Sequence, residues 1–235
     1  MKPSIDDIGK TAFESKSTNF DWVQNGTRAM IDLWMYNFAR NVSYILDGDS
    51  AKLLSVFKNN QKTLKNHKSD CSAVVIGGGP SVYEKNHLET LANSNYKGAI
   101  LCTDRMLIPC LKNGITPKKF PQFHVLTMDP YQITIKFYND KIVKKHAKGI
   151  SVIMSTCTIH ETVEICTNYG LNIFWFHPLI DDFRKQGSVS KIMNMMSKSD
   201  KNPDGFPGFQ TGGNVGCFSW VFSWAALGCS PVGLI

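Results

Sequence analysis

The chain has 235 residues, of which 43% are hydrophobic, and it carries a formal net charge of +7. This length suits one α/β domain with a small N-terminal extension, and the hydrophobic content excludes extended disorder. The positive charge suits an anionic ligand such as a nucleotide, and nucleic acid is the alternative. Because the lysines form short runs and no dense basic arm, we expect solvated helix faces and no nucleic-acid partner.

Targeting and metal-binding patterns are missing from the sequence. No apolar run approaches the roughly 20 residues that cross a membrane, and the first residues do not form a signal peptide. The seven cysteines are odd in number, lie in apolar contexts and include no C-x-x-C pair. This usage predicts free, buried thiols and no zinc site. We therefore expect a cytoplasmic protein that has no membrane partner.

Residues 1–70 predict an N-terminal helical extension. Apolar residues recur every three to four positions over 19–46, which is typical of a helix. The segment 47–50 interrupts this pattern, and Asp49 or Ser50 is expected to cap a second helix over 51–64. We expect the two helices to form a cap or flanking subdomain.

Residues 71–235 predict a Rossmann-like domain. Strands and helices alternate, which is typical of right-handed βαβ units and of a mostly parallel sheet between two helical layers. We expect strands at 73–76, 99–103, 123–127, 151–154, 172–176 and 231–235, and helices at 84–93, 106–113, 134–147, 159–169, 189–196 and 215–227. The segment 198–213 is predicted as a long loop. The sequence ends within a predicted strand, which suggests that the domain is truncated at its C-terminus.

The first predicted strand leads directly into a glycine-rich turn. The turn consists of Gly77, Gly78, Gly79, Pro80 and Ser81. Glycines permit a tight turn that exposes backbone N–H groups, and a helix follows, so the arrangement is typical of phosphate binding. The pattern lacks the third glycine of G-x-G-x-x-G and the G-K-[ST] of a Walker A motif. A tight turn without a ligand is the alternative.

Polar residues also follow the other predicted strands. They are Thr103, Asp104 and Arg105 after the second strand, Asp129 after the third, Ser155 and Thr156 after the fourth, and His177 after the fifth. Ligands of open α/β sheets bind beyond the carboxyl ends of the strands. Because independent strand ends agree, we predict a binding site at this edge of the sheet.

Asp104 and Asp129 are the candidate metal ligands. Magnesium takes one or two protein carboxylates and keeps several waters, so two carboxylates at neighbouring strand ends suit Mg²⁺ on a phosphate chain. The alternatives are a helix cap for Asp104 and an Asx turn for Asp129. Arg105 would neutralise phosphate or form a surface ion pair. His177 is a general base, a ligand contact or a satisfied structural histidine.

A second glycine-rich segment precedes the most apolar predicted helix. It consists of Gln210, Thr211, Gly212, Gly213 and Asn214. So apolar a helix is expected to be buried with its N-terminus at the edge of the sheet, where the segment would bind an anion or a polar ring. The alternative is a helix N-cap made by Thr211 or Asn214.

The order of these motifs resembles the 6-hydroxymethylpterin diphosphokinase family typified by archaeal MptE. The resemblance covers about residues 70–235. It rests on V-V-I-G-G-G-P-S from Val74, I-L-C-T-D-R from Ile100, L-K-N-G-I-T-P from Leu111, T-M-D-P from Thr127 and T-G-G-N-V-G from Thr211. The Maf motility accessory family, which resembles sialyltransferases, is a broader relative. The family pattern continues after the last strand with a glycine and an aspartate, which this sequence does not reach.

The resemblance implies a Rossmann-like enzyme that binds ATP and Mg²⁺. Such enzymes transfer diphosphate from ATP to 6-hydroxymethyl-7,8-dihydropterin and release AMP. Because these residues share the strand-end position, we assign their roles as a hypothesis: the turn at 77–81, together with Thr103, Arg105 and residues 211–213, would bind the nucleotide. Asp104 and Asp129 would hold the metal and, with Asn214, act in catalysis, whereas Ser155, Thr156, His177 and Gln210 would contact the pterin.

Two other functions stay open. One is a nucleotide-sugar glycosyltransferase of the Maf or sialyltransferase type, and the other is a non-catalytic nucleotide-binding module. Assembly as a homo-oligomer is also left open.

Overall fold

The structure is a computed structural model that describes residues 19–54, 72–211 and 213–235, with side chains from residue 30 onward. Its strands are β1 (Asp49–Ser50), β2 (Ala73–Ile76), β3 (Ala99–Thr103), β4 (Phe123–Thr127), β5 (Ser151–Ser155), β6 (Asn172–Pro178), β7 (Gly208–Phe209) and β8 (Val232–Leu234). In this part of the chain they form an eight-stranded sheet of order β1-β6-β5-β4-β3-β2-β8, with β7 beside β6. All pairings are parallel, as predicted.

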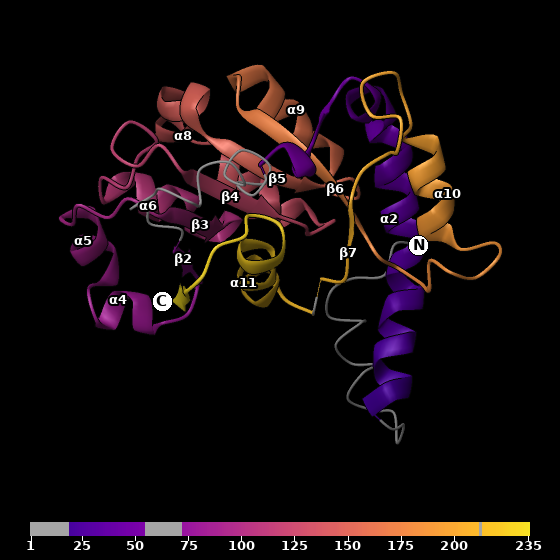
Figure 1. The fold of residues 1–235 in the computed structure, drawn as a ribbon, viewed down its shortest axis with the longest axis horizontal. Helices are drawn as coiled ribbons and strands as arrows, with labels where there is room; N and C mark the ends of the chain where they lie inside the picture. The colour runs from indigo at the N-terminus through magenta and orange to yellow at the C-terminus, as the bar shows by residue number, and fades with distance from the viewer. Residues whose placement is uncertain (1–18, 55–71, 212) are drawn as a thin grey trace, which may run out of the picture.

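Helices cover both faces of the sheet, which gives a three-layer α/β fold (Figure 1). The α-helices are α2 (Asn19–Leu46), α4 (Ser81–Glu84), α5 (His87–Ala92), α6 (Leu107–Lys112), α7 (Ile135–Tyr138), α8 (Lys141–His146), α9 (His160–Tyr169), α10 (Val189–Met196) and α11 (Val215–Ala225). Short 3-10 helices are η1 (Ala51–Leu54), η2 (Asp104–Met106), η3 (Gln132–Thr134) and η4 (Ala147–Gly149).

The chain order of the strands explains the two faces. From β2 to β6 each strand is added beside the one before it, and helices α5 to α9 pack on one face. The chain then crosses the opposite face through α11 and returns to β8, beside β2. Figure 1 shows α11 on the side of the sheet opposite to α6, α8 and α9. The carboxyl ends of β2, β3 and β4 therefore meet at one edge of the sheet.

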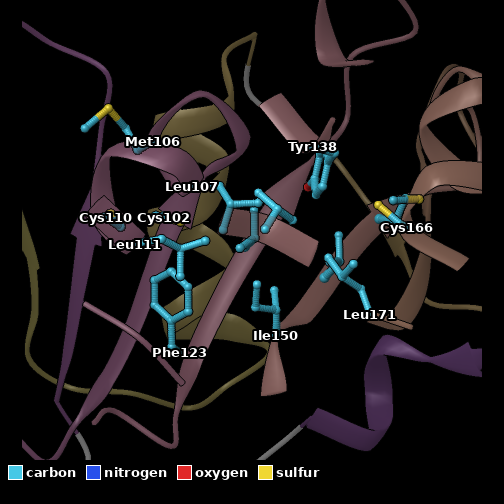
Figure 2. Packing of buried hydrophobic residues seen from close by; sticks show 14 of the residues in the cluster. Cys102, Met106, Leu107, Cys110, Leu111, Phe123, Tyr138, Ile150, Cys166 and Leu171 are labelled. Atoms are coloured by element: carbon cyan, nitrogen blue, oxygen red, sulfur yellow. The ribbon is translucent and has the colours of Figure 1, made fainter. Parts of the chain in front are cut away.

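Two apolar clusters hold the layers together, one on each face. The larger lies under α5 to α9, and Figure 2 shows its centre, where Phe123 and Ile150 of the sheet side meet Leu107, Leu111 and Tyr138. In the smaller cluster the Phe218 and Phe222 rings of α11 pack on the other face. Because β3 is buried along its whole length, its apolar segment could be recognised as a strand in the sequence.

The second predicted helix is preceded by a short strand that the sequence did not predict. Asp49 and Ser50 form β1 and pair with Phe174 and Trp175 of β6. The Ser50 hydroxyl also accepts the Lys52 amide (3.3 Å), so Ser50 makes the expected capping bond at the start of η1. Gly48 makes this approach possible, because a Cβ there would lie 2.3 Å from the Trp175 indole. Residues 51–54 form η1, and the rest of the predicted helix lies outside the described residues. The division of the chain at residue 70 stays a prediction.

Two other predicted helices differ from the expected ranges. The helix predicted over 134–147 is split into α7 and α8, because the Asp140 carboxylate accepts a hydrogen bond from the Ile142 amide (2.8 Å) and caps α8. The helix predicted over 84–93 is shorter and forms α5, which begins after Asn86 with its φ of 51°, whereas Glu84 ends the separate helix α4. The predicted loop over 198–213 contains β7.

No helix in the described ranges is long and apolar enough to cross a membrane. The predicted buried thiols are found at Cys102, Cys110, Cys157 and Cys166, whereas Cys217 is a free thiol that is exposed. Cys71 lies outside the described residues.

Candidate functional site

The glycine turn joins β2 to α4 at the carboxyl edge of the sheet. Its first amide, that of Gly77, donates to the Ile235 carbonyl (2.8 Å) and so extends the pairing of β2 with β8. The amides of Gly78, Gly79 and Ser81 find no acceptor among the described residues. Most of the turn's amides are thus free to bind a ligand, which is the property that a phosphate-binding turn requires.

A cation lies against this turn. A Cβ placed on Gly78 would lie 3.4 Å from Cδ of Arg105, so the Arg105 side chain runs past the glycine. Pro80 occupies the N-cap position of α4 and has no amide to offer. Free amides beside a guanidinium give an edge suited to an anion.

Asp104 follows β3 and is buried, with 3% of its surface exposed. The Thr127 hydroxyl at the end of β4 donates to one carboxylate oxygen, and the Arg105 amide donates to the other (2.7 Å). Burial raises the pKa of Asp104 to about 6 against the lowering effect of the Thr127 hydroxyl, and the charge of Asp129 adds to the rise. The carboxylate is therefore oriented by its partners and lies within electrostatic reach of Asp129.

Asp129 follows β4 and is half-buried. Burial raises the pKa of its carboxyl group. No described residue donates a hydrogen bond to this carboxylate, so the alternative of an Asx turn is not formed in the part of the chain that the structure describes. Within those residues no group of three or more His, Cys, Asp or Glu side chains could hold a metal ion. The two aspartates alone offer what Mg²⁺ requires, because it keeps several waters.

The Thr103 hydroxyl is an unsatisfied group at the same edge. Thr103 ends β3 and lies on the strand face that Leu101 occupies, toward α11. Its oxygen is buried and has no hydrogen-bond partner among the described residues. An unsatisfied buried hydroxyl costs about 1–3 kcal/mol, so a ligand that bonded to it would remove this cost.

The carboxyl ends of β5 and β6 differ, because their polar side chains bond to one another. His177 is 1% exposed; its Nδ1 lies 2.9 Å from the Thr156 hydroxyl and its Nε2 lies 2.9 Å from the Ser197 hydroxyl. The Ser197 hydroxyl donates its proton to the Asn194 carbonyl, so His177 Nε2 carries the proton and Nδ1 accepts from Thr156. Burial lowers the pKa of His177 to about 4. This is the geometry of a neutral structural histidine.

The other two predicted pterin contacts are Ser155, which is hydrogen-bonded within the protein, and Gln210, which is exposed. Ser155 is buried at the end of β5, where its hydroxyl oxygen accepts the Cys157 amide (3.1 Å). Gln210 is exposed in the segment before α11. No hydrogen bond joins any of the predicted pterin contacts to the glycine turn within the described residues.

The second glycine-rich segment ends in a helix cap. The Asn214 side-chain oxygen accepts the Cys217 amide (2.8 Å), which is the capping alternative for this residue. Thr211 is half-buried, and Gly213 has a φ of 86°. Gly212 lies outside the described residues. The catalytic role of Asn214 stays a prediction.

The sequence placed Thr127 at a strand end but did not predict that it orients Asp104. Two further residues were not predicted at all: the buried asparagines Asn37 and Asn41 of α2, which bond to the loops after β4 and β5. The pattern that could have revealed the asparagines is their spacing: two amides four residues apart lie on the same face of a helix.

Comparisons with known proteins agree with the motif order. Searches of curated proteins and of solved structures found no match to this chain. The family model described as 6-hydroxymethylpterin diphosphokinase MptE-like matches residues 36–235, which include α2 from Tyr36 onward and every strand of the sheet. The chain therefore belongs to the family described as 6-hydroxymethylpterin diphosphokinase MptE-like.

Proposed function

We propose that this protein transfers diphosphate from ATP to the hydroxymethyl group of 6-hydroxymethyl-7,8-dihydropterin, with Mg²⁺, and releases AMP. One observation carries the proposal: Asp104, bonded to Thr127 at the end of β4, lies within electrostatic reach of Asp129, and the neighbouring strand β2 ends in a turn whose amides are free. The family match supports a diphosphokinase-like activity, and the substrate pair is the finer part of the proposal.

The free amides and Arg105 would bind the phosphate chain. Phosphoryl transfer needs positioning and charge neutralisation more than covalent chemistry. Backbone amides at Gly78 and Gly79 supply fixed donors, and Arg105 supplies a positive charge beside them. The buried Thr103 hydroxyl is a further donor without a partner in the described residues.

The residues present fit a magnesium ion. Asp104 and Asp129 would hold it, and their raised pKa values express the repulsion and burial that a cation would relieve. When bound, Mg²⁺ neutralises the charge on the phosphate oxygens. The Thr127 hydroxyl and the Arg105 amide keep the Asp104 carboxylate in one orientation, as partners of a ligating carboxylate do.

The proposed reaction balances without a further reagent. The hydroxymethyl oxygen of the pterin forms a bond to the β-phosphorus of ATP. The bond from that phosphorus to the oxygen bridging the α-phosphate breaks, AMP leaves with this oxygen, and the hydroxyl proton passes to solvent. The chain's own contribution is to align the two reactants and to exclude other orientations.

The test is a product assay with a matched pair of variants. ATP, Mg²⁺ and 6-hydroxymethyl-7,8-dihydropterin are incubated with the protein, and AMP and pterin diphosphate are measured by chromatography. We expect AMP only when pterin and metal are both present. Asp129→Asn should abolish turnover with the fold intact, whereas Asp182→Asn, the same change at a half-buried aspartate after β6, should not.

Other results would contradict the proposal in distinct ways. An active, metal-dependent Asp129→Asn enzyme would remove the role of this carboxylate. Nucleotide binding without AMP formation would indicate a non-catalytic module. Binding of a CMP or UDP sugar without AMP release would indicate a glycosyltransferase.

A further inference from the structure

We infer that Asn37 of α2 is a positioning residue of the candidate site, because it holds the loop after β4 and thereby fixes Asp129, and that Asn41 holds the loop after β5, to which Asn37 also bonds. The inference that they hold these loops rests on the structure alone. Its kinetic consequence rests on the proposed function.

Asn37 bridges the two loops with one amide group. Its Nδ2 donates to the Pro130 carbonyl (3.0 Å) after β4 and to the Cys157 carbonyl (3.1 Å) after β5. Because carbonyl oxygens only accept, the orientation of this amide is fixed by its partners. Asn37 is 1% exposed, so both bonds are sheltered from water.

Asn41, one helical turn later, holds the second loop at two further points. Its Nδ2 donates to the carbonyls of Thr156 (3.2 Å) and Thr158 (2.7 Å). Its Oδ1 lies 2.9 Å from Nδ1 of His160, which must therefore carry a proton, since an amide oxygen cannot donate. Asn41 is fully buried, and every hydrogen-bonding atom of its amide group is used.

The four loop carbonyls that accept from Asn37 and Asn41 receive their hydrogen bonds from α2 alone among the described residues. No other hydrogen-bond donor among the described residues reaches them. A buried carbonyl that loses its partner costs about 1–3 kcal/mol, so replacing either asparagine with an apolar residue would favour movement of the loop toward water. The helix is thus a structural part of the edge that carries the site.

Asp129 is the residue most dependent on this arrangement. Asp104 is oriented by Thr127 and Arg105, whereas Asp129 has no donor of its own in the part of the chain that the structure describes. Its place is therefore set by the backbone that follows it. That backbone is held by Asn37 at Pro130, and the next side chain, Tyr131, donates its hydroxyl to Sδ of Met30 in α2 (3.1 Å).

The experiment compares two leucine variants with a control on the same helix. Asn37→Leu and Asn41→Leu remove the donors at nearly constant side-chain size. Arg40→Gln, between them in sequence, breaks the half-buried ion pair of Arg40 with Glu161 of α9 (2.8 Å) and leaves the four loop carbonyls bonded to the asparagines. Amide hydrogen exchange is followed over 76–82, 128–132 and 155–160, and the kcat and ATP KM of diphosphate transfer are measured.

We expect exchange over 128–132 to rise about tenfold in Asn37→Leu. Exchange over 155–160 should rise in both leucine variants, and exchange over 76–82 should stay unchanged in both. The kcat of Asn37→Leu should fall by about tenfold to a hundredfold, because a misplaced carboxylate affects the transition state. The KM for ATP should change by less than about twofold, because the glycine turn is untouched. Arg40→Gln should match the parent protein in every measurement.

The results that differ from these expectations distinguish the inference from the proposed function. Unchanged exchange over 128–132 in Asn37→Leu overturns the inference, whatever the protein catalyses. Faster exchange with an unchanged kcat overturns the positioning role and leaves the proposed function standing. A parent protein without diphosphate transfer overturns the proposed function, and the exchange data then decide whether the asparagines hold the loops. If a leucine variant does not fold, Asn37→Ser, too short to span both carbonyls, is judged by the same measurements.

Discussion

The carboxyl edge of the sheet has two halves that treat their polar groups in opposite ways. At the ends of β2, β3 and β4, three turn amides, the Thr103 hydroxyl and the Asp129 carboxylate have no hydrogen-bond partner among the described residues. At the ends of β5 and β6, Thr156, His177 and Ser197 form a continuous buried chain of hydrogen bonds. We refer to these as the open half and the closed half.

The two halves differ in role: the open half offers groups that can bind a ligand, and the closed half supports the fold. Buried polar groups in folded proteins are nearly always bonded, so the unbonded Thr103 hydroxyl marks a place where a ligand is expected. The turn amides at the end of the neighbouring strand are exposed and are open to the same ligand. A fully bonded network makes its part of the fold rigid. Because Asn37 bonds to Pro130 in one half and to Cys157 in the other, the closed half and α2 serve as the frame that supports the open half.

The largest expected effect is the loss of activity in Asp104→Asn. Removing one of two carboxylates should lower kcat by about a hundredfold or more. The melting temperature should not fall, because burial already raises the pKa of Asp104 to about 6 and so disfavours its charge. Thermal unfolding and AMP formation are measured side by side, with the exposed Asp204→Asn as the control. A destabilised but active Asp104→Asn variant would show that Asp104 has a structural role, like the residues of the closed half, and no role in catalysis.

The next effect concerns pH and His177. Its pKa is lowered to about 4 in the folded protein, below the ordinary value of 6.5, so below pH 6.5 the unfolded chain binds more protons than the folded one. The free energy of unfolding should therefore fall by about 1.4 kcal/mol per pH unit from pH 6.5 toward 4 through this group. Denaturant unfolding of the parent and of His177→Gln at pH 7 and pH 5 measures it.

We expect the pH-dependent loss to be about 2 kcal/mol smaller in His177→Gln. Burial also lowers the pKa of His124 to about 4, which acts in the same direction, whereas the raised pKa of Asp104 acts in the opposite one. Both groups titrate in both proteins, so their effects cancel in the comparison. Identical pH dependence in the two proteins would show that His177 is not held neutral.

The smallest effects come from two matched threonine variants. Thr156→Val removes the donor to His177 in the closed half and should cost about 1–3 kcal/mol of unfolding free energy, with the ATP KM changed by less than about twofold. Thr103→Val removes an unbonded hydroxyl in the open half and should leave stability equal or higher, while the ATP KM rises severalfold. Urea unfolding measures the stability of both variants, and steady-state kinetics measure their ATP KM. If Thr103→Val were destabilised and Thr156→Val raised the KM, the closed half would bind ATP and the open half would support the fold.

The sequence was informative wherever a segment is buried by its own composition. The strands 73–76, 99–103 and 123–127 were predicted with the bounds that the structure shows, because apolar, β-branched segments between turn residues are typical of buried parallel strands. The helix over 19–46 was predicted equally well. The two-residue strands β1 and β7 were not predicted, because such short pairings depend on the edge of β6 and not on strand propensity.

For the candidate site, strand ends could be read from the sequence but side-chain partners could not. The positions of Asp104 and Asp129 followed from the rule that ligands gather at carboxyl ends. The alternatives left open for His177 and Asn214 depended on residues distant in the chain or on local geometry: His177 bonds to Thr156 and Ser197, and Asn214 caps α11. The spacing of Asn37 and Asn41 puts both amides on one face of a helix, but it does not indicate which loops that face would hold.

By itself the sequence determined the parallel α/β sheet, the glycine turn after its first strand and the two aspartates at neighbouring strand ends, because burial pattern and turn chemistry are local properties. Only the tertiary structure decided which polar groups stay unbonded. A hydrogen bond between Asn37 and Pro130 joins residues 93 positions apart, and whether such groups meet depends on how the layers pack.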